Sequence, residues 1–182
     1  MKQFRNREDS LRFGLSIFLL IGSIAGTIFC NRMDEEMKGE LLNLERSMIS
    51  TSILQSLDLE ALFFRVFWRR LREIVFLLLL SATKAAYFGF LIASAVLGFF
   101  AAVLVSSMTM RRGIFGLFEF LSFVFPQVVV YLGEFYILAW WMPVRRKSFT
   151  WSLAALFLCT TIVGALMESF LNPWIVALVV NM

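Results

Sequence analysis

Four ionisable residues interrupt long apolar stretches of this sequence, and any chemistry inside a membrane would begin with them. They are Lys84, Glu119, Glu134 and Glu168. A charge at the centre of a bilayer costs roughly 2.5–3.5 kcal/mol on insertion scales, so such residues are paired, hold a ligand or reach an interface. Three roles are open for the carboxylates. They could be structural, paired with Lys84 or backbone donors or reaching an interface. They could instead hold a partner protein's helix or arginine, or line a proton or ion path.

The remaining side chains exclude most enzyme classes. The chain has no histidine, which removes histidine-based acid–base catalysis, Ser–His or Cys–His nucleophiles and histidine metal sites. Cys30 and Cys159 lie far apart, in or beside apolar runs, and are interpreted as packing residues. Asp34, Glu35 and Glu36 are adjacent acids in a polar segment, which is typical of solvated charge. Nucleotide, zinc, hydrolase and dithiol motifs are absent from the sequence. We therefore predict no enzyme activity, no cofactor and no metal.

The composition predicts the class of protein that would hold these carboxylates. Of 182 residues, 60% are hydrophobic and 16% are charged, too apolar for a water-soluble domain of this size. Several charge-free runs approach the roughly 20 residues that cross about 30 Å of hydrocarbon as a helix. We predict an all-α, polytopic membrane protein of one domain, with about five transmembrane or part-entering helices. The basic residues flank apolar runs, so the net charge of +4 indicates membrane anchoring rather than nucleic-acid binding.

The chain divides into four stretches. Residues 1–12 are basic, and residues 13–30 form a first span that is longer than the apolar core of a usual signal peptide. Residues 31–72 are polar and then amphipathic, and residues 73–182 hold the remaining helices. A straight helix over residues 74–107 would be about 50 Å long, beyond one crossing. We therefore expect a break near Lys84 to Gly89, giving helices from about 71 to 85 and from about 87 to 108.

The stretch 115–142 is expected to contain a broken helix. Pro126 removes a backbone donor and should break or kink the helix, with Gln127 beginning the second half. The first half, 114–124, could also be re-entrant. On an unbroken helix, Glu119 and Glu134 would lie roughly 60° apart in projection, on broadly the same side.

The last span is expected from about 149 to 169, with Glu168 near its end. Asn172-Pro173-Trp174 is expected to turn the chain, leaving 175–180 to lie against the membrane. With this division, the N-terminus and the basic residues 145–147 are cytoplasmic and residues 31–72 are external. Arg111 and Arg112 then lie outside, against the positive-inside tendency.

Small residues mark two faces where helices could pack closely. Gly22 and Gly26 are four residues apart in the first span, and Ser94 and Gly98 repeat the spacing later. Such patterns let helix backbones approach one another. The face of the first span could serve packing within the chain or a homodimer.

The polar segment also carries an amphipathic stripe that could dock a partner. Its apolar positions recur at helical spacing: Ile49, Ile53, Leu57, Phe63 and Phe67. Arginines from 65 to 72 suit a membrane surface. The segment could equally cover the ends of the helix bundle.

The order of these features resembles the stage II sporulation protein M family of bacterial membrane proteins. The resemblance rests on Gly22 to Gly26 with Asn31, on the small-residue-rich span from 89 to 107, on Gly113 and Gly116 leading into Pro126-Gln127, and on Glu168 to Pro173.

The resemblance implies a non-enzymatic integral protein of the bacterial cell membrane. The sporulation member acts in engulfment, where it is a scaffold for two peptidoglycan-degrading partners, sporulation proteins D and P. We therefore expect a membrane scaffold for cell-wall remodelling proteins, with membrane lipids around it. The alternative is a small transporter or permease subunit, which the broken helix and its glutamates would suit.

Overall fold

The fold was analysed in a computed structural model, which describes residues 2–49, 58–141 and 151–180. These residues form helices and short turns, without a strand among them, so the all-α prediction is confirmed. The elements are α1 (Lys2–Arg32), α2 (Glu35–Ile49), α4 (Leu59–Ser81), α5 (Ala86–Arg112), α6 (Ile114–Val124), α7 (Gln127–Trp141), α8 (Trp151–Leu166), the π-helical turn η1 (Met167–Leu171) and α9 (Asn172–Val180).

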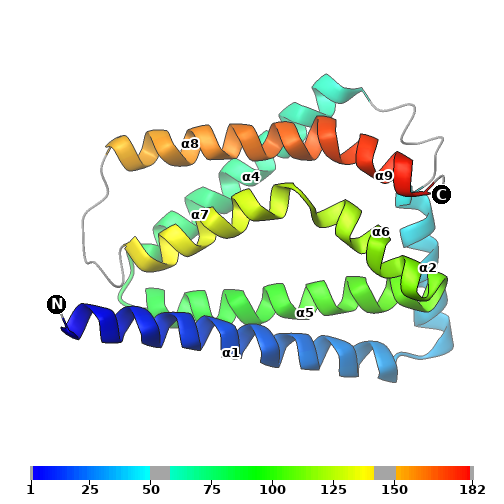
Figure 1. Cartoon of the computed structure of the whole chain (residues 1–182), viewed down its shortest axis with the longest axis horizontal. Coiled ribbons are helices and arrows are strands. Elements are labelled where there is room, and N and C mark those ends of the chain that lie inside the picture. The colour runs from blue at the N-terminus through cyan, green and yellow to red at the C-terminus, as the bar shows by residue number, and fades with distance from the viewer. Residues whose placement is uncertain (1, 50–57, 142–150, 181–182) are drawn as a thin grey trace.

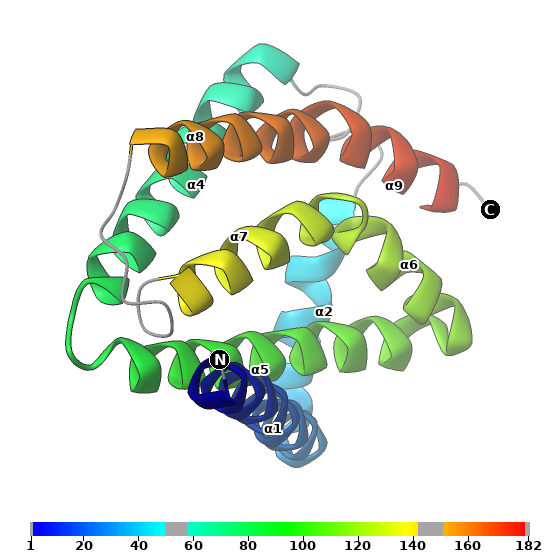
Figure 2. The same ribbon diagram turned by 60° about the vertical axis from the view of Figure 1, so that its left-hand side comes forward.

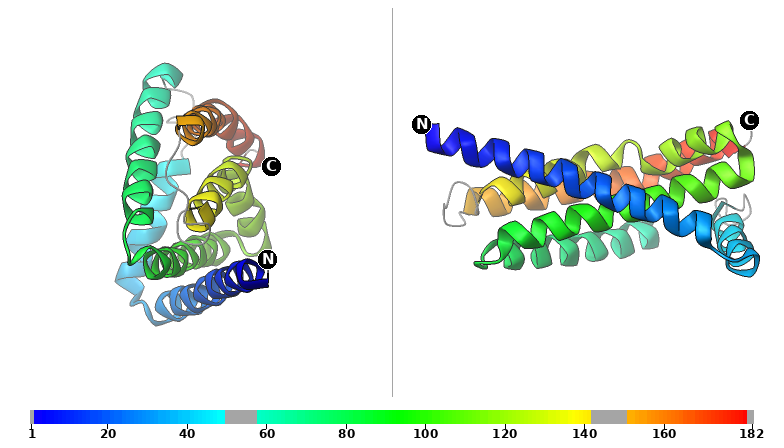
Figure 3. Two further views of the ribbon diagram at one scale, coloured as in Figure 1. Left: turned by 90° about the vertical axis from the view of Figure 1, so that its left-hand side faces the viewer. Right: turned by 90° about the horizontal axis from the view of Figure 1, so that it is seen from below.

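The helices form an elongated bundle of five passes that alternate in direction (Figure 1). In order, the passes are α1, α4, α5, the pair α6–α7, and the run α8–η1–α9. α1 and α5 run side by side in the same direction. α8 lies at the opposite side, with α7 between them and α4 along one flank (Figures 1 and 2). α2 lies across one end of the bundle, as the end view and the view from below also show (Figure 3).

Three helical stretches are long and apolar enough to cross a membrane. They are Glu8–Arg32, Ala86–Arg112 and Trp151–Val176, and the bent pair α6–α7 would be a fourth if it acts as one span. The break that we expected between two helices falls at residues 82–85. α4 is not among these candidate spans; most of its charges lie in its first half and its longest apolar run in its second.

Small residues join α1 to α5 along a close seam. A methyl group added at Gly22 would fall on the Ala95 carbonyl oxygen, and one at Gly26 would lie 2.5 Å from the Phe99 carbonyl oxygen. From the other side, the Ser94 hydroxyl donates to the Leu15 carbonyl over 2.8 Å. The glycine face of the first span therefore packs within the chain, against α5.

Helix boundaries differ from our expectation at two places in the first half of the chain. The basic N-terminal residues are helical from Lys2 and continue into the first span. The pass that we began near Leu71 begins at Leu59 instead. Asp58 caps it by accepting hydrogen bonds from the backbone N–H groups of Glu60 and Ala61, at 3.1 and 3.3 Å. One helix therefore joins the charged segment to the apolar one.

The expected turn at Asn172-Pro173-Trp174 was wrong. The chain stays helical through Pro173, because the π-helical turn η1 directly precedes α9. Pro173 has no N–H to donate to the preceding turn. Just before it, the Asn172 backbone N–H donates to the Met167 carbonyl five residues back, which is the π-helical pattern. The wider π-turn takes up the change of register. Residues 172–176 therefore extend the last span instead of leaving it.

A cluster of buried apolar side chains lies in one half of the bundle. Its buried members are contributed by α1, α4, α5, α7 and α8 near the 82–85 turn: Leu11, Ile74, Ala86, Phe90, Leu138, Ala139, Leu153 and Phe157. The other half, toward α2 and α6, encloses a cavity of about 740 Å³. The candidate site lies on the wall of that cavity.

Candidate functional site

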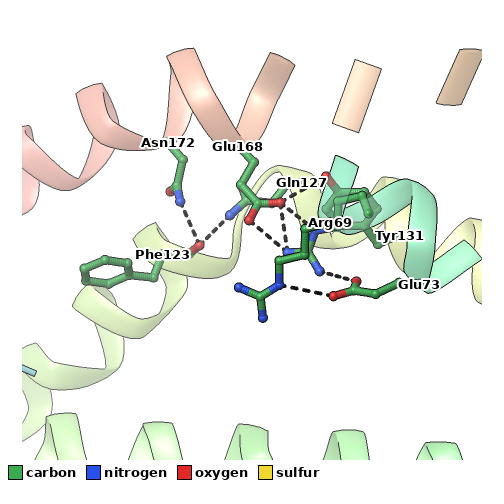
Figure 4. A network of polar contacts seen from close by, with 8 residues as sticks. Arg69, Glu73, Phe123, Gln127, Tyr131, Glu168 and Asn172 are labelled. Carbon is green, nitrogen blue, oxygen red and sulfur yellow. Dashed lines mark hydrogen bonds and ion pairs between the residues drawn. The ribbon is translucent and has the colours of Figure 1, made fainter. Parts of the chain in front are cut away.

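The break between α6 and α7 leaves a backbone carbonyl that side chains must satisfy. The two helices meet at Pro126 with a bend of 63°, as the missing proline N–H predicts. At the end of α6, the Phe123 carbonyl accepts hydrogen bonds from the side-chain amides of Gln127 and Asn172. Figure 4 shows the two amides converging on this oxygen. The break is thus closed by one residue from α7 and one from α9.

The same two amides each leave an oxygen without a partner. Gln127 is 6% exposed, and its Oε1 atom accepts no hydrogen bond from the described residues. The Oδ1 atom of Asn172 is also buried and accepts no hydrogen bond from the described residues. Because the Phe123 carbonyl can only accept, each amide must turn its N–H toward it and its oxygen away. The wall of the cavity therefore carries two buried acceptors that require donors.

Beside these amides, Arg70 of α4 is held by two carboxylates. Its Nε and Nη2 atoms donate to Glu168 over 2.8 and 2.9 Å, and Nη1 donates to Glu73 over 2.8 Å. The Tyr131 hydroxyl donates to Glu168 over 3.0 Å, and the guanidinium lies 4.4 Å from the Tyr131 ring centre. This cluster joins α4, α7 and η1, and part of it is drawn in Figure 4.

The two-pronged bond between Arg70 and Glu168 spans 98 positions of sequence. The side chains of the pair are 25% and 21% exposed, so water screens it weakly. An arginine and a carboxylate in this fork geometry form one of the strongest side-chain pairs. Arg70 therefore faces the interior, whereas we expected the arginines of this segment to lie at the membrane surface. The neighbouring Arg69 is far more exposed, at 70% of its side chain.

Glu119 belongs to a second and separate cluster. It is completely buried, and its Oε2 atom accepts a hydrogen bond from Arg111 and lies 3.9 Å from the Nε atom of Arg112. Ser122 packs beside it and donates to its backbone carbonyl. Glu119 therefore offsets part of the positive charge of the two arginines at the α5–α6 turn.

Glu134 is the third intramembrane carboxylate and is bound by hydroxyl groups alone. Its Oε1 atom accepts hydrogen bonds from Thr160 and Thr161 of α8. No cation lies within ion-pair distance of it in the described ranges. Glu119 and Glu134, which we expected on one side of a common helix, thus have different partners because Pro126 separates their helices.

The cavity has a polar end and an apolar wall. The polar end contains Gln127, Tyr131, Glu168 and Asn172 together with Arg69, Arg70 and Glu73, and Glu134 lies further along. The apolar wall is formed chiefly by leucine and phenylalanine side chains from α4, α5, α6 and α7, with Leu41 of α2 at one end. The volume of the cavity lies within the range of about 300–1,000 Å³ that is usual for small-molecule sites.

The predicted site residues fall into three groups. Gly22, Gly26, Ser94 and Gly98 form the α1–α5 seam. Gln127 and Glu168 meet at the cavity with Asn172, while Pro126 and Pro173 position them. Lys84 lies exposed in the 82–85 turn and takes no part.

The predicted docking stripe is only partly described by the structure. Ile53 and Leu57 lie outside the described residues, and Ile49 ends α2. Phe63 and Phe67 stack on each other 6.0 Å apart and are half-buried. The exposed aromatic side chains on this part of α4 are instead Phe64 and Trp68, at 60% and 59%.

Three central residues, Arg70, Tyr131 and Asn172, were missed as site residues from sequence, and Asn172 was expected only in a turn. A signal for Arg70 was present, because it begins the helical spacing 70, 74, 77, 81, whose later members Ile74, Leu77 and Ser81 face the interior. Tyr131 had no such signal, because its helix is apolar on every face.

Comparison with known proteins does not relate this chain to a family or to a known fold. No family model, no curated protein and no solved structure matches the chain.

Proposed function

We propose that this chain is a non-enzymatic membrane scaffold that holds other membrane or wall-associated proteins at one end of its bundle. The observation that carries the proposal is the bond between Arg70 and Glu168, which fixes α4 to the last pass. α4 continues without a break from that anchor to its charged first half. The charged half is therefore held in a defined position relative to the membrane helices, as a docking surface requires.

The chemistry of that half suits a surface at the membrane boundary. Phe64 and Trp68 are exposed one turn apart, and Arg65 and Arg72 are exposed on the same stretch. Trp and Arg favour the interface, where an apolar body and a polar group are both accommodated. The resemblance to the stage II sporulation protein M family favours peptidoglycan-degrading partners, with sporulation proteins D and P as the first to test.

We further propose that the N-terminus is cytoplasmic and that the docking surface around Phe64 and Trp68 lies on the external side of the membrane. The N-terminal end of α1, the turn at Lys84 and the ends of α7 and α8 share one end of the bundle (Figure 1). The basic residues at the start of α1 belong to that side, and the basic residues 145–147 follow α7 in the sequence. Arg111 and Arg112 belong to the other, where the buried Glu119 offsets part of their charge. The positive-inside tendency counts Lys and Arg rather than net charge, so this orientation rests on the two basic groups at the start of α1 and after α7.

Capture of the two wall-degrading partners after crosslinking in native membranes tests the scaffold. We expect wild type to recover both, and the double variant Phe64→Ala/Trp68→Ala to lose them. Phe76→Ala is the matched control, because Phe76 is 66% exposed on the apolar half of the same helix. Equal recovery by all three proteins would reject the docking surface, and recovery by none would reject these partners.

The alternative function is a small transporter or permease subunit. The cavity beside a broken helix favours it, because transporters place their substrate sites at such interruptions. Flux of protons, Na⁺ and K⁺ from liposomes, with wild type against Glu134→Gln, tests this function. Equal leakage from protein-loaded and empty vesicles would reject ion transport.

A further inference from the structure

We propose that the cavity binds a membrane lipid whose headgroup donates hydrogen bonds, through an ammonium or hydroxyl groups. This inference is independent of the scaffold role, since it concerns the interior of the bundle and not the outer face of α4. It rests on the two acceptor oxygens, on the charges around them, and on the size and lining of the cavity.

The two acceptors define what the ligand must supply. Gln127 Oε1 and Asn172 Oδ1 are both buried and have no donor among the described residues. Their orientation is fixed, because both amide nitrogens are committed to the Phe123 carbonyl. A buried acceptor that is left unpaired loses the free energy of its hydrogen bond to water without replacement. A ligand that brings N–H or O–H groups would recover that free energy, whereas one that offers only acceptors would not.

The charges near the acceptors point to the same chemistry. Two arginines and three glutamates line the cavity, giving a formal charge of −1. Arg70 is already held by both Glu73 and Glu168. An anionic headgroup that paired with Arg70 would have to break those bonds, and it would meet three carboxylates against two arginines.

The apolar wall indicates that the rest of the ligand is hydrocarbon. Leu97, Leu104 and Leu132 line the cavity, yet each keeps over two-fifths of its surface exposed. They belong to α5 and to the α6–α7 pair, both of which are candidate spans. Within a bilayer, acyl chains would cover such a wall while the headgroup reaches the polar end.

The volume distinguishes a lipid from a partner's transmembrane helix. A helix about 10 Å wide that crosses about 30 Å of hydrocarbon occupies roughly 2,400 Å³. The cavity measures about 740 Å³, which suits a headgroup with the first part of its acyl chains. A helix would also arrive with its backbone donors already used, and so could satisfy the two oxygens only through side chains.

Retention of defined lipids by the purified full chain tests the proposal. The protein is exchanged into mixed micelles and the retained lipid is counted by native mass spectrometry. Phosphatidylethanolamine and a neutral glycosyl diacylglycerol are compared with phosphatidylcholine of the same acyl chains, which has no headgroup donor. Dimethylated phosphatidylethanolamine, which is bulky but keeps one N–H, separates hydrogen bonding from headgroup size. We expect about a tenfold preference for at least one donor-bearing lipid over phosphatidylcholine.

Variants locate the site and guard against misfolding. Gln127→Met should remove most of the preference, and the Phe123 carbonyl would keep its bond from Asn172. Val129→Met adds the same side chain on an outward face of α7, 62% exposed, and should retain the preference. Leu104→Trp should lower retention of every lipid by filling the cavity. If Gln127→Met does not fold, Asn172→Leu removes the other acceptor.

Three results would overturn the proposal. The first is equal retention of all the lipids by wild type, which would mean that water satisfies the two oxygens. The second is a preference that persists in a folded Gln127→Met or Asn172→Leu protein. The third is a preference that follows headgroup size alone, with dimethylated phosphatidylethanolamine behaving like phosphatidylcholine. A preference for phosphatidylethanolamine alone would identify an ammonium ligand, and one for the glycolipid alone would identify a hydroxyl ligand.

Discussion

Replacing Arg70 by methionine should strongly destabilise the bundle, whereas the same change at Arg69 should not. The two arginines are adjacent and have the same volume, but they differ in burial and in partners. Arg70 makes three bonds to two carboxylates and its side chain is 25% exposed. Arg69 makes one bond of 3.3 Å to Glu73 and its side chain is 70% exposed. The comparison therefore separates the buried pair from the general effect of losing an arginine.

The expected magnitude follows from what the substitution leaves behind. Arg70→Met strands the Glu168 carboxylate with only the Tyr131 hydroxyl, and removing one member of a buried pair costs about 3–5 kcal/mol. We expect about 3 kcal/mol, the lower end, because both partners keep some exposure. The double variant Arg70→Met/Glu168→Met replaces the pair by packed apolar side chains and should cost about 1 kcal/mol or less. Arg69→Met should cost under about 1 kcal/mol.

The free energy of unfolding can be measured by titrating the protein in mixed micelles with a denaturing detergent and following tryptophan fluorescence. A double-mutant cycle then gives the coupling between the two side chains. Equal losses from Arg69→Met and Arg70→Met would refute the claim that Arg70 faces the interior. A double variant whose loss equals the sum of the single losses would refute the claim that the two residues form a pair.

The same titration tests two further expectations, and labelling tests a third. Gly22→Ala should cost about 1–3 kcal/mol because its methyl group meets α5 backbone, whereas Gly133→Ala, with nothing within 4 Å, should be neutral or stabilising. Glu119→Gln should lower the free energy of unfolding by about 2 kcal/mol, because it removes the carboxylate that pairs with Arg111. Glu134→Gln should lower it by under about 1 kcal/mol, because an amide oxygen also accepts a hydrogen bond from threonine. In a cysteine-free background, Lys84→Cys should be labelled from the same side as an N-terminal tag; labelling from the opposite side would overturn the order of passes.

Local backbone chemistry made part of this molecule predictable. A proline without an N–H breaks an apolar helix wherever it folds, so the bend at Pro126 was foreseeable. The cost of unpaired polar groups in lipid likewise makes a chain of this composition helical. The small residues of α1 and α5 were recognisable because close packing depends on side-chain size. Each of these features is determined by residue type and short-range spacing.

The partners of the buried charges were not predictable in the same way. Glu168 lies 98 positions from Arg70, and nothing in either local sequence names the other. Pro173 looked like a turn, but the π-turn before it keeps the last pass helical. Pairing inside a bundle depends on which helix faces meet, which is a property of all the passes together.

Residue types and short spacings are enough to predict a helical membrane protein with a break at Pro126 and two small-residue packing faces, because transfer free energies and backbone geometry act locally. The folded bundle decides that those two faces meet and where the polar groups go. It assigned Glu119, Glu134 and Glu168 to three separate sets of partners, and it brought Gln127 and Asn172 to one carbonyl beside a cavity. The physical reason is that a buried polar group is stabilised only by whichever donor or acceptor the packed helices bring within bonding distance.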